Sequence, residues 1–287
     1  MLFSADREKT HLGGGISISP DGRLLVFVGD DNRLYLRDID TAEEKVLLED
    51  AGAGLDVFYD PEFSSDGKRI LFAASGGTWY YPSNIYSVEL DGSGLQRLTQ
   101  ARQLPASDRP LYAEYFSWAK ESPDATRVLL RVYDAVAKKD KAAVLDRRSR
   151  RIQYPVEGRP IAWSNDNQWI YYAQERTVRR LNLNTGESQA LDNLSGQIVG
   201  KAADRETFAI VQEGRSMLAT VQDHSITTRQ WNIPSSVSVS HVRRETGKAQ
   251  TDRLTLTSVA WSRSARLALY YQGETLERIE VVENPAP

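Results

Sequence analysis

The 287-residue sequence contains no cysteine, three histidines and two methionines. The absence of cysteine excludes disulfide bonds, thiolate metal ligands and thiol catalysis. The histidines, His11, His224 and His241, are far apart in the sequence and show none of the short spacings typical of metal ligands. We therefore expect no metal site, no cofactor and no catalytic histidine.

Long apolar runs are also missing. No stretch is long enough to span a bilayer, and the segment after Met1, LFSADREKTHLGGG, lacks the apolar core of a secretory signal. As written, the sequence predicts a cytoplasmic protein without membrane insertion. The alternative is a periplasmic protein whose signal peptide has been removed. The formal net charge of −3 gives no general attraction for nucleic acid, so we expect no nucleic-acid partner.

Amphipathic helical patterns are absent as well, and the sequence contains a repeat instead. Its clearest copy, Pro61 to Thr99, reads as four strands: PEFS, the apolar RILFAAS, the alternating NIYSVEL and LQRLT. Tight turns separate these strands at Ser65-Asp66-Gly67 and Asp91-Gly92-Ser93-Gly94. Glycine supplies the positive φ that such turns need, so we predict a positive φ at Gly67.

Copies of the first turn recur along the chain, each ahead of an apolar strand. Four resemble Ser-x-Asp-Gly and two are degenerate: 19–22, 64–67, 122–125, 164–167, 203–205 and 262–265. Their mean spacing is about 49 residues, near the ~40–50 residues of a four-stranded propeller blade. An aromatic residue often precedes the turn, as at Phe63, Trp118, Trp163 and Trp261. Six copies predict six blades.

The predicted fold is therefore all-β: a six-bladed β-propeller of four-stranded antiparallel blades, forming a single domain over residues 1–287. The blades are expected at 15–48, 58–99, 113–156, 160–191, 195–231 and 256–283. The last blade lacks an outer strand. We expect residues 2–9 to supply it by pairing near 275–283, because closing the ring removes exposed strand edges. The polar connection 232–256 contains VSVSHV, where the pattern leaves an extra strand open.

The turn and strand motifs resemble those of one known family. The S-P-D-G turn, the apolar strand after it, the D-I-D-T or L-D-G-S turn and the closing L-T are similar to TolB-type six-bladed β-propellers. The resemblance covers nearly the whole chain and is closest in blades one to four. Its motifs are turn and core residues, which specify architecture and carry no chemistry. The TolB-like family includes envelope scaffolds that bind partner proteins, and similar propellers cap some peptidases.

The connections of such blades divide between two faces of the disc. With the strands of a blade named A to D from the centre outward, the A–B and C–D turns share one face and are short. The B–C loops and the connections between blades share the other, here called the loop face. All the long segments fall there: 48–58, 76–83, 99–112, 134–140 and 232–256. Because binding residues concentrate in loops over a rigid scaffold, this face is expected to carry the function.

Aromatic residues gather in or beside the loop-face segments of blades two and three. They are Phe58, Tyr59, Trp79, Tyr80, Tyr81, Tyr112 and Tyr115. Aromatic rings with a polar tip are favoured at protein interfaces, although such rings can also simply pack a loop onto a blade. We interpret the chain as a non-enzymatic, monomeric scaffold that binds another protein or a peptide through these residues.

Two alternatives stay open. Carboxylates near the start of inner strands, Asp56, Asp60, Glu62 and Glu114, could face a central channel. Paired there, they would permit a glycoside hydrolase or a lyase; solvated acids at the channel mouth are the simpler explanation. The other alternative is a sensor of a saccharide or small ligand. A basic run over 138–151 is interrupted by Asp140 and Asp146, and we interpret it as a solvated edge.

Overall fold

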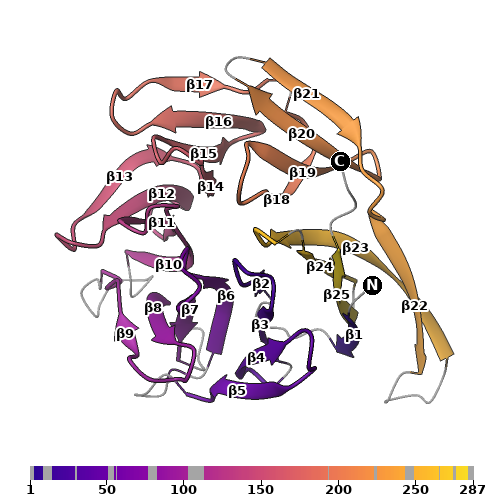
Figure 1. Cartoon of the computed structure of the whole chain (residues 1–287). Coiled ribbons are helices and arrows are strands. Elements are labelled where there is room, and N and C mark those ends of the chain that lie inside the picture. Colours follow the sequence, from indigo (N-terminus) through magenta and orange to yellow (C-terminus); the bar gives the residue numbers. More distant parts are fainter. Residues whose placement is uncertain are drawn as a thin grey trace.

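The structure, a computed structural model, describes residues 3–8, 15–29, 31–50, 55, 57–76, 83–102, 113–192, 194–222, 225–242, 249–264, 266–273 and 276–283. In these ranges every regular element is a β-strand, and the strands form six antiparallel sheets around a common centre (Figure 1). The predicted six-bladed β-propeller is confirmed. None of the described residues forms a helix of the length and apolarity that membrane crossing requires.

Five blades consist of four consecutive strands, from the inner strand A to the outer strand D. Blade one has β2 (Ile16–Ile18), β3 (Leu24–Val28), β4 (Leu34–Asp38) and β5 (Glu44–Leu48), and blade two has β6 (Val57–Phe63), β7 (Arg69–Ser75), β8 (Asn84–Glu89) and β9 (Gln96–Arg97). Blade three has β10 (Glu114–Glu121), β11 (Arg127–Asp134), β12 (Lys139–Asp146) and β13 (Ile152–Glu157).

Blades four and five repeat the same order. Blade four has β14 (Arg159–Trp163), β15 (Trp169–Gln174), β16 (Thr177–Asn182) and β17 (Ser188–Ala190). Blade five has β18 (Gln197–Lys201), β19 (Thr207–Gln212), β20 (Arg215–Gln222) and β21 (Ser225–Gln230). In blade two the B strand, β7, is buried from Ile70 to Ser75, because both of its faces pack against other parts of the protein.

Blade six joins the two ends of the chain. Its strands are β23 (Ala249–Trp261), β24 (Arg266–Gln272), β25 (Leu276–Glu283) and, outermost, β1 (Phe3–Glu8). β1 pairs antiparallel with β25 from Phe3 opposite Val281 to Glu8 opposite Leu276. The predicted closure of the ring by residues 2–9 is therefore confirmed.

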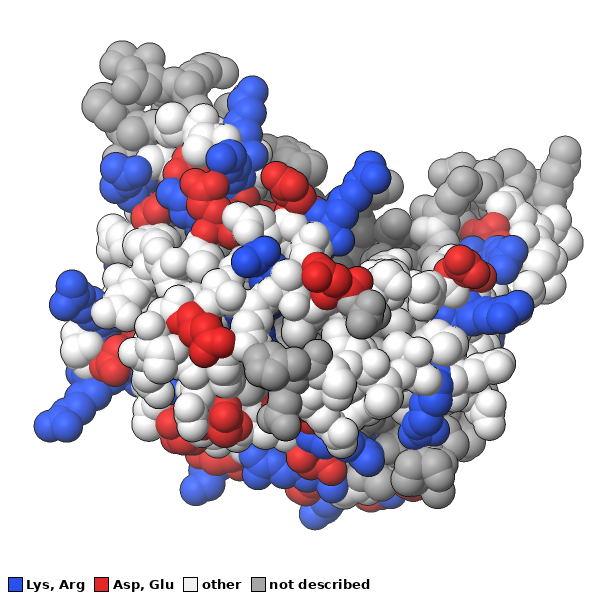
Figure 2. Space-filling model, turned by 90° about the horizontal axis from the view of Figure 1, so that it is seen from above, with Lys and Arg blue, Asp and Glu red and all other residues white. Residues whose placement is uncertain are grey.

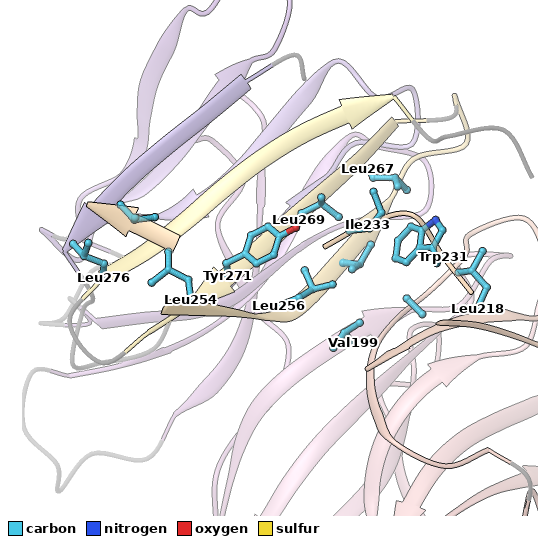
Figure 3. Packing of buried hydrophobic residues seen from close by; sticks show 13 residues of the cluster. Val199, Leu218, Trp231, Ile233, Leu254, Leu256, Leu267, Leu269, Tyr271 and Leu276 are labelled. Atoms are coloured by element: carbon cyan, nitrogen blue, oxygen red, sulfur yellow. The ribbon is translucent and has the colours of Figure 1, made fainter. Parts of the chain in front are cut away.

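The inner strand of blade six is longer than the repeat predicts. β23 begins at Ala249, and its first half pairs with β22 (Ser236–Val242), while its second half pairs with β24. The segment 232–256 thus contains a β-hairpin that continues the sheet beyond the blade (Figure 1). Leu254 and Val239 of this hairpin join a buried cluster with Trp231 and Leu276 (Figure 3), so burial of apolar side chains holds the hairpin against blades five and six.

The Ser-x-Asp-Gly turn owes its shape to a repeated set of side-chain hydrogen bonds. In blade two, Ser64 Oγ donates to Asp66 Oδ1 at 2.6 Å and accepts from the Arg69 amide at 2.9 Å. The same serine–aspartate bond measures 2.5 to 2.6 Å in the other three well-formed copies. The fourth turn position is left-handed in all four, with φ of 75° at Gly22, 72° at Gly67, 59° at Ala125 and 62° at Asn167. The prediction for Gly67 is confirmed.

Ala125 is the turn residue least suited to this conformation. Its Cβ clashes with the backbone in the left-handed region, which costs an L-residue roughly 1–2 kcal/mol. We expect Ala125→Gly to raise the free energy of unfolding in urea by about 1 kcal/mol, since glycine relieves this strain but loses more backbone entropy on folding. Gly67→Ala, the reverse change in the preceding blade, should lower the free energy of unfolding by a similar amount. If Ala125→Gly does not raise the free energy of unfolding and Gly67→Ala does not lower it, the two turns do not share this geometry.

The residue directly before the turn differs from the predicted aromatic pattern in blade three. Phe63, Trp163 and Trp261 each precede the turn serine, but Trp118 lies mid-strand, paired with Arg131, and Glu121 takes the equivalent place. The Glu121 side chain is only 1% exposed. It accepts hydrogen bonds from the Ser65 amide at 2.8 Å and the Ser65 hydroxyl at 2.7 Å, and it pairs with Arg147. A buried carboxylate therefore ties blade three to the turn of blade two.

A similar link joins blades four and five. The Asn165 amide, in the turn position of Ser65, donates to Glu206 Oε1 at 2.6 Å. In blades one and three the same turn position is proline, Pro20 and Pro123, which has no amide hydrogen to satisfy. In blades two and four the free N–H at this position thus receives a carboxylate from the next blade, whereas in blade six the Arg263 amide donates to the Pro20 carbonyl at 2.8 Å.

Candidate functional site: the central channel

All six inner strands line a central cavity of about 750 Å³. Its wall includes the first residues of β14 and β18, the β15–β16 turn and the end of β24, so it opens on the loop face. A smaller cavity of about 150 Å³ lies toward the opposite face, beside Phe63, Glu121 and Trp163. Glu62, Lys120 and Lys201 border both cavities. Together they form the two halves of the propeller's channel.

Eight charged residues line the larger cavity. The cations are Lys120, Arg131, Arg159, Arg176 and Lys201, and the acids are Asp60, Glu62 and Glu175. They come from blades two to five, and no short sequence motif unites them. Cations are therefore in excess in this half of the channel.

Two of the channel cations are held by neighbouring groups. Lys120 Nζ lies 3.4 Å from Glu62 Oε1, and Glu62 Oε2 also accepts a hydrogen bond from the Ser17 hydroxyl at 3.1 Å. Lys201, 5% exposed, donates to Asn165 Oδ1 at 2.6 Å and lies 3.4 Å from Glu206. Burial lowers the pKa of Lys201 although Glu206 opposes the effect. Both lysines mainly connect blades.

The two arginines at the mouth are bound differently. Arg131 makes a bidentate pair with Asp140, with Nε and Nη2 each 2.9 Å from a carboxylate oxygen. Arg159, at the start of β14, pairs with Ala173 through the strand ladder, but its exposed side chain forms no hydrogen bond or ion pair with any described residue. Burial lowers the pKa of Arg159, and repulsion from Arg131 lowers it further, whereas Asp140 and Asp60 favour its charge. Arg159 is thus a cation close to another cation and without a partner of its own.

Asp60 sits in a strained segment of β6. A β-bulge between Tyr59 and Glu62 displaces it from regular pairing, and its φ is +42°. A Cβ built on Gly15 would lie 2.7 Å from the Asp60 Cα, so only glycine allows blade one to approach this closely. Burial, and then the negative charge of Glu62, raise the pKa of Asp60 to about 7, although Arg159 and Arg131 oppose the shift.

The four carboxylates that the sequence suggested as channel residues do not all lie in the channel. Asp60 and Glu62 both line the channel. Glu114 is not in the channel wall; its Oε1 accepts a hydrogen bond from the Tyr154 hydroxyl at 3.1 Å. This contact and burial raise the pKa of Tyr154 to about 12. Asp56 lies outside the described residues.

The aromatic residues predicted to bind a partner fall into three groups: one is buried, two are half-buried and four lie outside the described residues. Phe58 is 1% exposed and packs against Phe72 with ring centroids 5.6 Å apart, so it belongs to the core and cannot reach a partner. Tyr59 is half-buried and its hydroxyl lies 3.2 Å from Ser75 Oγ. Tyr115 is also half-buried, and its ring lies 5.2 Å from that of Tyr133 across the β10–β11 pair. Outside the described residues are Trp79, Tyr80, Tyr81 and Tyr112.

The described residues that flank 77–82 and 103–112 lie side by side. Ser83 accepts from the Phe116 amide at 3.0 Å through its carbonyl, and its hydroxyl donates to the Phe116 carbonyl at 2.6 Å. The Ala113 amide donates to the Arg102 carbonyl at 2.8 Å. Segments 77–82 and 103–112, whose sequences contain Trp79, Tyr80, Tyr81 and Tyr112, therefore both end next to Tyr115; they are called the aromatic segments below.

Sequence reasoning missed Arg131 and Arg159. An arginine in a strand of ordinary composition carries no local mark of a channel position, and only the geometry of the ring brings these two together. The one available indication was Arg159 standing just before the first residue predicted for blade four.

The remaining polar groups give no sign of a metal centre. Among the described residues, no group of three histidine, aspartate or glutamate side chains could hold a metal ion. His11 and His224 lie outside the described residues, as does the side chain of His241.

The basic run on blade three is partly neutralised. Lys139 pairs with Glu157 at 3.0 Å and Lys141 with Asp134 at 2.6 Å, and Arg147 pairs with Glu121. On the side of the molecule shown in Figure 2, basic and acidic side chains are intermixed, without a broad area of one sign.

No protein-family model matches the sequence, and no curated protein matches it. Solved structures do match. TolB from Acinetobacter baumannii is 18% identical, with a TM-score of 0.53, covering 77% of this chain; this chain spans only 54% of that one. The putative TolB from Agrobacterium tumefaciens is 17% identical, with a TM-score of 0.53 and coverage of 95% of this chain and 90% of that one.

Other propellers are equally similar in structure. The calcium-binding protein regucalcin from Agrobacterium tumefaciens is 12% identical, with a TM-score of 0.58, over 96% of this chain and 93% of that one. A puromycin-hydrolysing peptidase from Mycobacterium tuberculosis is 14% identical, with a TM-score of 0.56, over 92% of this chain and 44% of that one. Such identities show a shared fold. The resemblance to TolB propellers is confirmed at that level, while the presence of a peptidase among the matches means that the fold does not decide between scaffold and enzyme.

Proposed function

We propose that this chain is a non-enzymatic scaffold that binds another protein or an extended peptide on its loop face, around blades two and three. The observation that carries this proposal is the adjacency of the two aromatic segments at their roots, where Ser83 bonds to Phe116 and Arg102 to Ala113. A hydrogen-bonded junction between two blades, at the ends of segments whose sequences contain Trp79, Tyr80, Tyr81 and Tyr112, is a suitable platform for interface anchors. The fold shared with TolB proteins is consistent with a partner protein.

Tyr115 supports the same surface. It is half-buried, packed against Tyr133 at a tilt of 36° and directly beside the junction, so its ring presents area at little entropic cost. Phe58 is excluded from the proposed surface because it is buried in the core. The proposed contact residues are therefore Tyr59, Trp79, Tyr80, Tyr81, Tyr112 and Tyr115.

We expect Trp79→Ala and Tyr112→Ala to weaken partner binding by about 2 kcal/mol each, roughly 30-fold, with little change in melting temperature. The test is capture from a native extract by the immobilised chain, followed by titration of the captured protein against each variant. Arg148→Ala, at the exposed β12–β13 turn of the opposite face, serves as the control.

Two outcomes of this experiment would count against the proposed surface. Normal binding by both loop variants would place the functional surface elsewhere. Unfolding of both variants would mean that the aromatic residues pack the loops and say nothing about a partner.

A second candidate function has one specific observation in its favour. Asp60 titrates near neutrality beside Glu62 in a cavity, an arrangement typical of general acid–base pairs. A glycoside hydrolase or lyase would use this pair. Turnover of chromogenic glycosides that Asp60→Asn abolishes, without loss of fold, would favour the enzyme over the scaffold.

A further inference from the structure

We propose that the loop-face half of the channel binds a small oxyanion, a carboxylate or a phosphate-type group, between Arg159 and Arg131. The site lies inside the ring, whereas the proposed partner surface lies on the loops of blades two and three. The two proposals are therefore independent.

The first argument is the unbalanced charge of Arg159. The Arg159 side chain lines a cavity of about 750 Å³ and has no hydrogen bond or ion pair to a described residue. It is close enough to Arg131 for the like charge to lower the pKa of Arg159. A guanidinium with five N–H donors and no acceptor partner is suited to bind a planar carboxylate or a tetrahedral oxyanion.

Arg131 adds a donor whose orientation is already fixed. Its Nε and Nη2 are held by Asp140, which leaves Nη1 without a described partner. A guanidinium locked in this way loses little conformational entropy when a ligand binds. Arg176, in the β15–β16 turn, places a further positive charge in the wall of the same cavity.

Asp60 makes the site sensitive to pH. The charged groups that act on it are Glu62 of its own strand, Arg131 of β11 and Arg159 of β14, while Lys120 and Arg176 line the same cavity. Because the pKa of Asp60 is raised to about 7, its carboxyl loses its negative charge just below neutrality. Asp60 then no longer offsets the positive charge of Arg159 and Arg131, although Asp140 still pairs with Arg131. An oxyanion should therefore bind more tightly as the pH falls below 7, with uptake of a proton.

The test is calorimetric titration with tartrate and with sulfate, both fully ionised over the range from about pH 6 to about pH 8.5. Threitol, the neutral analogue of tartrate, is the control ligand. We expect binding of at least one anion and none of threitol, with affinity about fivefold or more higher at the lower pH. Preference for tartrate would indicate a carboxylate ligand, and preference for sulfate would indicate a phosphate-type ligand.

Three variants test the residues. Arg159→Gln should lower the affinity about tenfold or more without lowering the melting temperature, since the arginine has no partner to lose. Arg148→Gln, on the opposite face, should bind as the unaltered chain does. Asp60→Asn should bind at about pH 8.5 as tightly as the unaltered chain does at about pH 6.

Asp60→Asn should also fold. A carboxyl whose folded pKa lies above its unfolded value contributes less stability once the pH rises through the folded pKa, so the amide should be no less stable at the higher pH. The proposal is overturned if neither anion binds, or if Arg159→Gln binds as well as the unaltered chain. Should Arg159→Gln fail to fold, Arg159→Lys and Arg176→Gln take its place, with reduced affinity expected for both. Loss of partner capture in the loop variants would not change any of these titrations.

Discussion

A chain that lacks residues 1–8 should melt roughly 6 °C or more below the full chain, which corresponds to about 3 kcal/mol for a protein of this size. The truncation removes β1, whose six residues pair with β25 from Leu276 to Val281. It therefore exposes the backbone edge of β25 and the adjoining apolar cluster, where Ile279 is 2% and Val281 0% exposed.

Ring closure makes this loss larger than that of an ordinary end strand. Blade six packs its inner strand on both β2 and β18, so loosening β25 also weakens its contacts with blades one and five. We expect the truncated chain to aggregate at concentrations where the full chain does not, because an open β-edge pairs with other chains.

The missing strand can also be added back to the truncated chain. A synthetic peptide of residues 1–9, added in excess, should restore part of the melting temperature by binding as the missing strand, whereas a scrambled peptide should not. A truncated chain that melts like the full chain would show that β1 contributes nothing to closure.

Glu121→Ala should lower the free energy of unfolding in urea by about 3 kcal/mol. The carboxylate is buried, accepts from the Ser65 amide and hydroxyl and pairs with Arg147. Removing one member of a buried, hydrogen-bonded group typically costs several kcal/mol because its partners stay desolvated. Glu157→Ala, which removes an exposed ion pair with Lys139, should change stability by no more than about 0.5 kcal/mol.

The prolines of blades one and three offer a rescue. Ser65→Pro places at the blade-two turn the residue found at Pro20 and Pro123, and it eliminates the amide that Glu121 satisfies. In the Glu121→Ala background this second change should recover about 1 kcal/mol, whereas with Glu121 present it should be destabilising. Additive effects would mean that the amide is not the source of the loss.

The sequence alone was sufficient for the architecture. Ser-x-Asp-Gly turns at 19–22, 64–67, 122–125 and 164–167 are made by hydrogen bonds within a few residues, so their pattern is visible locally. Counting them predicts six blades, and the missing outer strand of the last blade predicts closure by residues 2–9. Even the left-handed φ of Gly67 follows from the residue type.

The tertiary structure decided where side chains meet. Asp60, Arg131 and Arg159 come from three blades and converge only because the ring closes around a channel. The burial of Phe58, predicted to contact a partner, and of Glu121, which precedes its turn in place of an aromatic residue, depends on packing between neighbouring blades. Turn formation is governed by contacts between residues close in sequence, whereas the content of a channel is governed by contacts between residues tens of positions apart, for which a single sequence carries no local pattern.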